Sequence, residues 1–212
     1  GFDPDDFQGL RPKHSSDGFV ITFTGRFSLE KNFSLSFLQA IREIVNENPE
    51  LAARLKIVLA GYMGERERQL IKLLSLTEIV EEVGYVPHRK SIQLLLESDV
   101  LLLANIPGPA REVIYTGKLF EYLAAQKPIL ALMEACVAAQ LLIRTSAGVV
   151  VPPHDIKAIK QAIVALYQQR GIQPEPRPWL RDFERKVLTQ SLARCLDEVT
   201  MQRTGARGSQ CP

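Results

Sequence analysis

Two basic residues and a glycine lie close together in the stretch TGRFSLEKN, residues 24–32. Gly25 permits a close approach of the backbone to a ligand, and Arg26 and Lys31 follow it on a short connection into a predicted helix. A guanidinium binds phosphate through two hydrogen bonds, an ammonium adds a point charge, and the first N–H groups of a helix also bind anions. The stretch predicts a diphosphate site; the competing interpretation is that Arg26 and Lys31 are solvated loop charges.

A second candidate site is the stretch YTGKLFEYLAAQ, residues 115–126. Gly117 and Lys118 begin a predicted helix there, so that the N–H groups of its first turn and the lysine charge would both attract an anion. Glu121 follows one turn later and could accept hydrogen bonds from a pair of hydroxyl groups, such as those of a ribose. The competing interpretation is an exposed Lys–Glu pair at i and i+3, which contributes roughly 0.2–0.5 kcal/mol to a helix.

The elements that must position these residues follow an alternating pattern. Short apolar or β-branched runs alternate with amphipathic stretches, which is typical of βαβ units and predicts a doubly wound α/β fold with a Rossmann-like parallel sheet of about six strands. The predicted strands cover residues 19–25, 56–61, 79–86, 99–104, 128–132 and 148–152, and the predicted helices cover residues 34–48, 65–76, 89–98, 118–126, 135–145, 155–169 and 180–199. Because such sheets bind ligands beyond the carboxyl ends of their strands, near the switch point, both candidate stretches are expected at that edge.

Composition and charge argue against several classes of protein. The 26 basic and 24 acidic residues are dispersed and give a net charge of +2, which is not the footprint of a nucleic-acid-binding protein. Gly61 and Gly64 precede a predicted helix, but no G-x-G-x-x-G pattern occurs in the chain, which disfavours a nicotinamide-dependent dehydrogenase.

Cysteine and acidic residues give no sign of a metal site. The three cysteines are widely spaced and lack histidines at ligand spacing, which predicts reduced thiols rather than a disulfide framework or a zinc site. The acidic run from Asp3 to Asp6 is typical of turns and helix caps. No stretch is long and apolar enough to predict a transmembrane helix.

In this order, the stretches GRFSLEKN, LAG, VGYVPHRKSIQLLLESDVLLL and TGKLFEYLAAQKPILAL resemble the C-terminal, donor-binding domain of the retaining GT-B glycosyltransferases of family four. The resemblance covers residues 1–169. It implies one half of a GT-B fold, which binds a UDP-, GDP- or ADP-linked sugar and takes part in its transfer to a glycan, lipid or other acceptor with retention at the anomeric carbon. It also implies that no metal or other cofactor is needed, because cations of the protein stabilise the leaving phosphate.

The resemblance further assigns roles to individual residues. Arg26 and Lys31 correspond to the catalytic basic pair that neutralises the donor diphosphate, and Glu121 to the acid that holds the ribose. The other donor-binding positions that it implies are Gly25 and Gly61, Val86 and Pro87 at the nucleobase, and Gly117, Lys118 and Leu119 at the phosphates.

One position departs from the E-x7-E element of that family. Glu121 matches the second glutamate of the element, but Val113 stands where the first is expected, and Glu112 is the candidate for a shifted acid. The contact of this acid with the donor sugar is therefore left open. A non-catalytic nucleotide-binding module and a sugar-nucleotide epimerase of the same fold are the alternatives.

The chain begins with GFDPDDF, without methionine, and is expected to be a domain excised from a longer protein. Residues 1–17 are expected to lead in from a missing N-terminal acceptor domain, and residues 18–171 to form the donor-binding domain. Residues 172–201 would be a proline-rich connector and a C-terminal crossing helix, and residues 202–212 a flexible tail. The isolated domain is expected to bind nucleotide without turnover, and the full-length protein to be cytoplasmic, with peripheral association at the inner membrane face left open.

Overall fold

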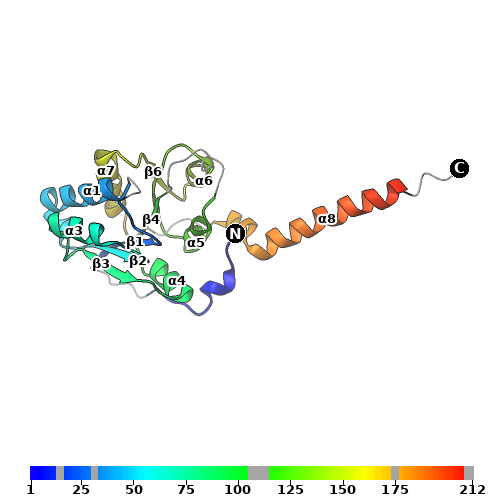
Figure 1. Ribbon diagram of the computed structural model, residues 1–212, viewed down its shortest axis with the longest axis horizontal. Coiled ribbons are helices and arrows are strands. Elements are labelled where there is room, and N and C mark those ends of the chain that lie inside the picture. The colour runs from blue at the N-terminus through cyan, green and yellow to red at the C-terminus, as the bar shows by residue number, and fades with distance from the viewer. Residues whose placement is uncertain (13–16, 30–32, 105–114, 173–176, 208–212) are drawn as a thin grey trace.

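A six-stranded parallel sheet forms the centre of the computed structural model, which describes residues 1–12, 17–29, 33–104, 115–172 and 177–207 (Figure 1). The strand order is β3-β2-β1-β4-β5-β6. The chain adds β2 and β3 on one side of β1 and then crosses back to add β4, β5 and β6 on the other side. The strands are β1 (Phe19–Thr24), β2 (Leu55–Ala60), β3 (Val80–Gly84), β4 (Val100–Ala104), β5 (Ile129–Leu132) and β6 (Gly148–Val151). The predicted doubly wound fold is confirmed, and its switch point lies between β1 and β4.

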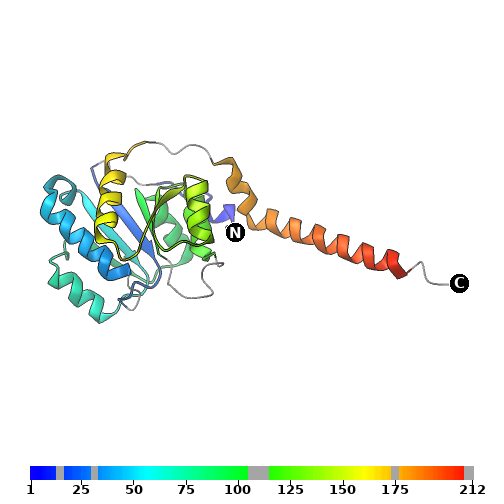
Figure 2. The same cartoon turned by 90° about the horizontal axis from the view of Figure 1, so that it is seen from above.

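Helices cover both faces of the sheet, as Figures 1 and 2 show. One apolar core lies under α1 (Phe33–Glu47), α2 (Pro49–Ala52), α3 (Glu65–Leu73) and α7 (Ile156–Gln168). A second core lies under α4 (His88–Leu96), α5 (Gly117–Ala124) and α6 (Val137–Arg144). Because both faces are covered, the central strands are apolar runs rather than alternating ones.

Helix α2 is the one short helix of the first layer that the sequence pattern did not predict. Pro49 lacks an N–H group, and Asn48 caps the new helix by accepting a hydrogen bond from the N–H of Leu51 at 3.1 Å. The expected helix over residues 34–48 is therefore α1, and a separate short helix follows it.

Strand β1 carries buried threonines that are hydrogen-bonded to the helix layer of α4 and α5. Thr22 Oγ1 accepts a hydrogen bond from Ser98 Oγ at 2.5 Å. The N–H of Thr24 donates to Tyr122 Oη at 3.0 Å, and the two hydroxyl oxygens lie 3.1 Å apart. Tyr122 is fully buried, so α5 is fixed to the carboxyl end of β1 by a polar contact inside the core.

Replacing Tyr122 with phenylalanine is expected to lower the free energy of unfolding by about 1–3 kcal/mol at neutral pH, because the buried N–H of Thr24 loses its acceptor. Burial raises the pKa of Tyr122 to about 12, from 10.0, so the folded protein keeps a proton that the unfolded chain loses above pH 10. Between these two pKa values the folded protein binds more protons than the unfolded chain. The free energy of unfolding therefore decreases as the pH rises from about 10 to about 12. Urea denaturation at pH 7 and pH 11 measures both effects.

The matched control for this variant is Tyr85→Phe, because the Tyr85 side chain is 94% exposed and its hydroxyl is solvated. Tyr85→Phe is expected to leave the urea midpoint unchanged at pH 7. A Tyr122→Phe variant with the midpoint of the wild type would contradict the structural role of the buried hydroxyl.

The N-terminal segment and the C-terminal helix lie against each other at the edge of the domain. The N–H of Phe2 donates to the carbonyl of Phe183 at 3.0 Å, and the N–H of Arg185 donates to the carbonyl of Phe2 at 2.9 Å. These bonds join the segment before η1 (Pro4–Phe7) to the junction of η3 (Pro178–Phe183) and α8 (Arg185–Arg207). Figure 1 accordingly shows the N-terminus at the base of α8.

Helix α8 projects away from the domain in both views (Figures 1 and 2). The expected start of this helix at residue 180 is replaced by the 3-10 turn η3, and the helix continues to Arg207, beyond the expected boundary at residue 201. Its apolar side chains Leu188, Leu192 and Leu196 are exposed by 43, 60 and 57%. In the described part of the chain, no helix is long and apolar enough to span a bilayer.

Candidate functional site

The loops that follow β1 and β2 run side by side beyond the carboxyl edge of the sheet. The N–H of Gly25 donates to the carbonyl of Ala60 at 2.7 Å, and the N–H of Phe27 donates to the carbonyl of Tyr62 at 2.9 Å. Gly61 has φ of 136°, and a Cβ atom on it would overlap the backbone of Gly25. A glycine is therefore required at position 61 for both its conformation and its packing.

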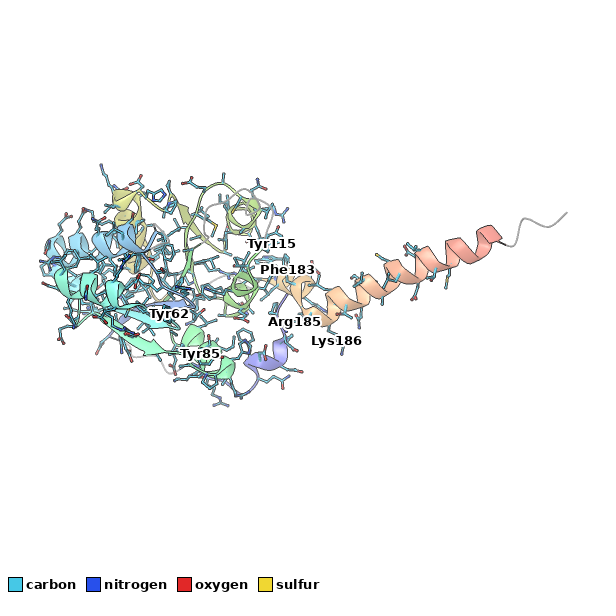
Figure 3. All side chains as sticks on the ribbon, viewed as in Figure 1. Tyr62, Tyr85, Tyr115, Phe183, Arg185 and Lys186 are labelled. Carbon is cyan, nitrogen blue, oxygen red and sulfur yellow. The ribbon has the colours of Figure 1, made fainter. Side chains whose placement is uncertain are left out.

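Arg26 lies on this loop above an aromatic ring. Its guanidinium carbon is 5.0 Å from the centroid of the Tyr62 ring, which is a cation–π distance. Tyr62 is 60% exposed, so the pair lies at the surface of the sheet edge, where Figure 3 labels the tyrosine. The Tyr62 ring limits the directions in which the guanidinium can extend.

Buried groups beneath the loop hold it in place. Glu67, only 6% exposed, accepts a hydrogen bond from the N–H of Leu29 at 2.7 Å, which ties the loop to α3. Ser34 Oγ donates to the carbonyl of Ser28 at 2.8 Å, which ties it to α1. The backbone that presents Arg26 is therefore anchored to both of the helices that follow these strands.

The start of α5 meets the same loop. Lys118 Nζ lies 4.7 Å from the centroid of the Phe23 ring, and a Cβ atom on Gly25 would collide with that Nζ. The two stretches singled out in the sequence are thus adjacent in space, as the switch-point rule predicts. Among the described residues, a Cβ atom on Gly117 would meet no atom within 4 Å, so none of them covers the helix end on that side.

Leu119 has a mainly structural position at the start of α5. Its side chain is fully buried, and its N–H donates to the carbonyl of Thr116 at 3.1 Å. In this structure the N–H of Leu119 is thus bonded within the turn rather than directed at the open side of the helix end.

Glu121 faces the loop that follows β3. Its Oε1 lies 3.1 Å from Nε2 of His88, the first residue of α4. Val86 is half-buried and Pro87 is exposed immediately before that histidine, so the predicted nucleobase loop lies next to the predicted ribose acid. Tyr85, 94% exposed and labelled in Figure 3, begins the same loop.

Some predicted site residues lie outside the described residues, namely Lys31, Glu112 and Val113. Sequence reasoning missed the contacts of Tyr62 and His88. His88 directly follows a proline at a predicted helix start, but nothing in the sequence links it to Glu121, 33 positions later. Within the ranges that the structure describes, no three or more His, Cys, Asp or Glu side chains are grouped as metal ligands.

The sequence profile of the family described as Glycosyl transferases group 1 matches residues 18–169 of the chain. The chain belongs to this family. The matched region begins just before β1 and ends just after α7, so it includes every residue of the candidate site.

Two curated proteins from bacteria are similar to this chain in sequence. It is 24% identical over 169 residues to the putative colanic acid biosynthesis glycosyltransferase WcaL of Escherichia coli K12, covering 76% of this chain and 41% of WcaL. It is 27% identical over 159 residues to an exopolysaccharide phosphotransferase of Streptomyces coelicolor, covering 75% of this chain and 16% of that protein. The chain therefore spans less than half the length of either relative.

Solved structures of other proteins share the fold of this chain. Anabaena HepE in complex with UDP-glucose superposes with a TM-score of 0.69 at 19% identity, over 93% of this chain and 56% of HepE. The pneumococcal O-GlcNAc transferase GtfA in complex with UDP and GlcNAc superposes with a TM-score of 0.62 at 20% identity, over 90% of this chain and 38% of GtfA. At these identities the likeness establishes the fold, which is that of one half of a GT-B glycosyltransferase.

Proposed function

We propose that this chain is the donor-binding half of a retaining glycosyltransferase that transfers a hexose from a UDP-, GDP- or ADP-linked donor to a glycan, lipid or other acceptor. The observation that carries the proposal is the meeting of Gly25 and Lys118 at the switch point of the sheet, with Glu121 one turn further along α5 beside His88. The start of α5, which carries Lys118, lies beside the Gly25 loop, which carries Arg26, so two cations lie at this end of the group.

The order of these groups matches the order of the parts of a nucleotide sugar. The diphosphate would lie at Arg26, Gly25 and the start of α5, the ribose at Glu121, and the nucleobase at the β3–α4 loop. As the glycosidic bond breaks, negative charge develops on the departing diphosphate, and cations held in position there stabilise it. Transfer without a metal ion is part of this proposal.

The neighbours support a nucleotide-sugar donor. HepE was solved with UDP-glucose and GtfA with UDP and GlcNAc, and WcaL is described as a putative glycosyltransferase of colanic acid biosynthesis. A cytoplasmic location, with peripheral association of the full-length protein at the inner membrane face, fits such a role in surface-glycan synthesis.

The terminal segments support an acceptor domain elsewhere in the full-length protein. Phe2 pairs with the junction of η3 and α8, so both segments assigned to the domain connection lie together. The exposed Leu188, Leu192 and Leu196 of α8 would be covered by that acceptor domain. An acceptor site that needs both domains explains why the isolated chain is expected to bind nucleotide without turnover.

Calorimetric titration of the chain with UDP, GDP and ADP tests the proposal. The wild type is expected to bind at least one of them, and Glu121→Ala to bind it about tenfold or more weakly, because hydrogen bonds from the ribose to a charged acceptor are lost. Glu78→Ala is the matched control, since this exposed acid precedes β3 at the opposite edge of the sheet. Binding of none of the three nucleotides would refute the proposal.

A further inference from the structure

His88 is the polar neighbour of the Glu121 carboxylate that the proposed function does not use. Nε2 of His88 lies 3.1 Å from Glu121 Oε1, within hydrogen-bonding distance. An ionised carboxylate only accepts hydrogen bonds, so the Nε2–H group of the imidazole donates. The carboxylate side chain is 21% exposed and the imidazole 52% exposed, so a ligand can reach the pair from solvent.

This hydrogen bond supplies a constraint that a glutamate lacks on its own. The last torsion of a glutamate side chain is broad, so an unsupported carboxylate has no single orientation. A donor at Oε1 fixes the plane of the group and leaves Oε2 for a ligand. Recognition of a diol, with two hydroxyl groups at fixed spacing, depends on such an orientation.

The imidazole is itself held by the N-terminal segment. Its Nδ1 lies 3.8 Å from Asp6 Oδ1, an ion-pair distance that applies when the ring is protonated. One residue further along α4, Arg89 Nη2 donates to the carbonyl of Gln8 at 3.0 Å. The N-terminal segment thus lies against both His88 and Arg89 in the first turn of α4.

We propose that His88 is a positioning residue for ribose recognition: it orients the Glu121 carboxylate toward the 2′- and 3′-hydroxyl groups of the donor nucleotide. The inference rests on the proposed function and adds a residue to the same site. It predicts that His88 acts on affinity only through Glu121 and only for nucleotides that carry the diol.

Two conservative replacements distinguish the two ring nitrogens. The amide nitrogen of glutamine lies near the place of Nε2, whereas that of asparagine lies near the place of Nδ1. His88→Gln is therefore expected to keep the hydrogen bond to Glu121, and His88→Asn and His88→Ala to lose it. Arg89→Ala is the matched control, because it removes a contact of the same helix turn with the N-terminal segment but none with Glu121.

The experiment titrates each variant with the diphosphate that the wild type binds best among UDP, GDP and ADP, and with its 2′,3′-dideoxy form. His88→Ala and His88→Asn are expected to weaken binding of the ribonucleotide about five- to tenfold, which lies in the range of the net contribution of one hydrogen bond, and to leave the dideoxy form unchanged. His88→Gln and Arg89→Ala are expected to bind both as the wild type does. In a Glu121→Ala background, His88→Ala should cause no further loss.

The outcomes separate this inference from the proposed function. If the wild type binds none of the diphosphates, the proposed function fails and the inference fails with it. If Glu121→Ala weakens binding but His88→Ala does not, or if His88→Ala weakens both nucleotide forms equally, the proposed function stands and the positioning role of His88 is wrong.

Discussion

Replacing Gly61 with alanine is expected to lower the free energy of unfolding by about 2–6 kcal/mol. Two costs add: a φ of 136° strains any residue with a Cβ atom by about 1–3 kcal/mol, and the new methyl group must displace the backbone of Gly25, which costs about 1–3 kcal/mol more. The two loops that form the candidate site would move apart. Urea denaturation followed by circular dichroism measures the loss.

Two other glycines of the site provide graded controls for this prediction. Gly25 has a φ of 115°, so Gly25→Ala carries a strain cost as well, but its Cβ would meet Lys118 Nζ, the end of a flexible side chain that can move. It is therefore expected to cost less than Gly61→Ala, whose Cβ must displace backbone. The new methyl group of Gly117→Ala, at the start of a helix, meets no atom of the described residues within 4 Å, so this variant is expected to change stability by less than about 1 kcal/mol in either direction. Equal destabilisation by the three variants would contradict the packing argument.

The sheet could be predicted from the sequence because each strand is specified by its own residues. The six apolar or β-branched runs fall on the six strands to within a few residues. The helix predicted over residues 155–169 begins with an aspartate, a residue type that caps helices, and Asp155 Oδ1 accepts a hydrogen bond from the N–H of Ala158 at 2.9 Å. Local signals of this kind depend on neighbours within about four positions and can be recognised without a structure.

The contacts of the candidate site could be predicted only in part. Adjacency of the Gly25 loop and the start of α5 follows from the switch-point rule, which needs only the topology. The cation–π contacts of Arg26 and Lys118 depend on where long side chains extend after folding, and the sequence carries no spacing rule for them. Likewise, Thr24 and Tyr122 are 98 positions apart, and their bond forms only because the fold brings α5 to the carboxyl end of β1.

The C-terminal helix illustrates a different limit of sequence reasoning. The apolar side chains at positions 188, 192 and 196 do recur at helical spacing, and the helix does form. A hydrophobic pattern predicts that a surface will be covered but does not say by which partner. In this structure the helix leaves the domain instead of packing on it, as Figure 2 shows, so the periodicity predicted the element but not its environment.

Replacing Arg26 with alanine is expected to weaken binding of the preferred nucleoside diphosphate about 10- to 100-fold. A guanidinium makes charge-assisted hydrogen bonds to a diphosphate, and each such bond contributes about 1.5–3 kcal/mol. Binding of the nucleoside without phosphates is expected to stay unchanged, because its base and ribose would contact the β3–α4 loop and Glu121. Calorimetric titration with the diphosphate and with the nucleoside measures both affinities.

Arg54→Ala is the matched control for Arg26→Ala, because Arg54 directly precedes β2 and therefore lies at the amino edge of the sheet, away from the site. It removes the same charge from the chain and is expected to leave both affinities unchanged. Salt should also weaken diphosphate binding more steeply in the wild type than in Arg26→Ala, since the variant has one charge interaction fewer to screen. Equal losses for the diphosphate and the nucleoside would mean that Arg26 supports the fold of the loop rather than the binding of phosphate.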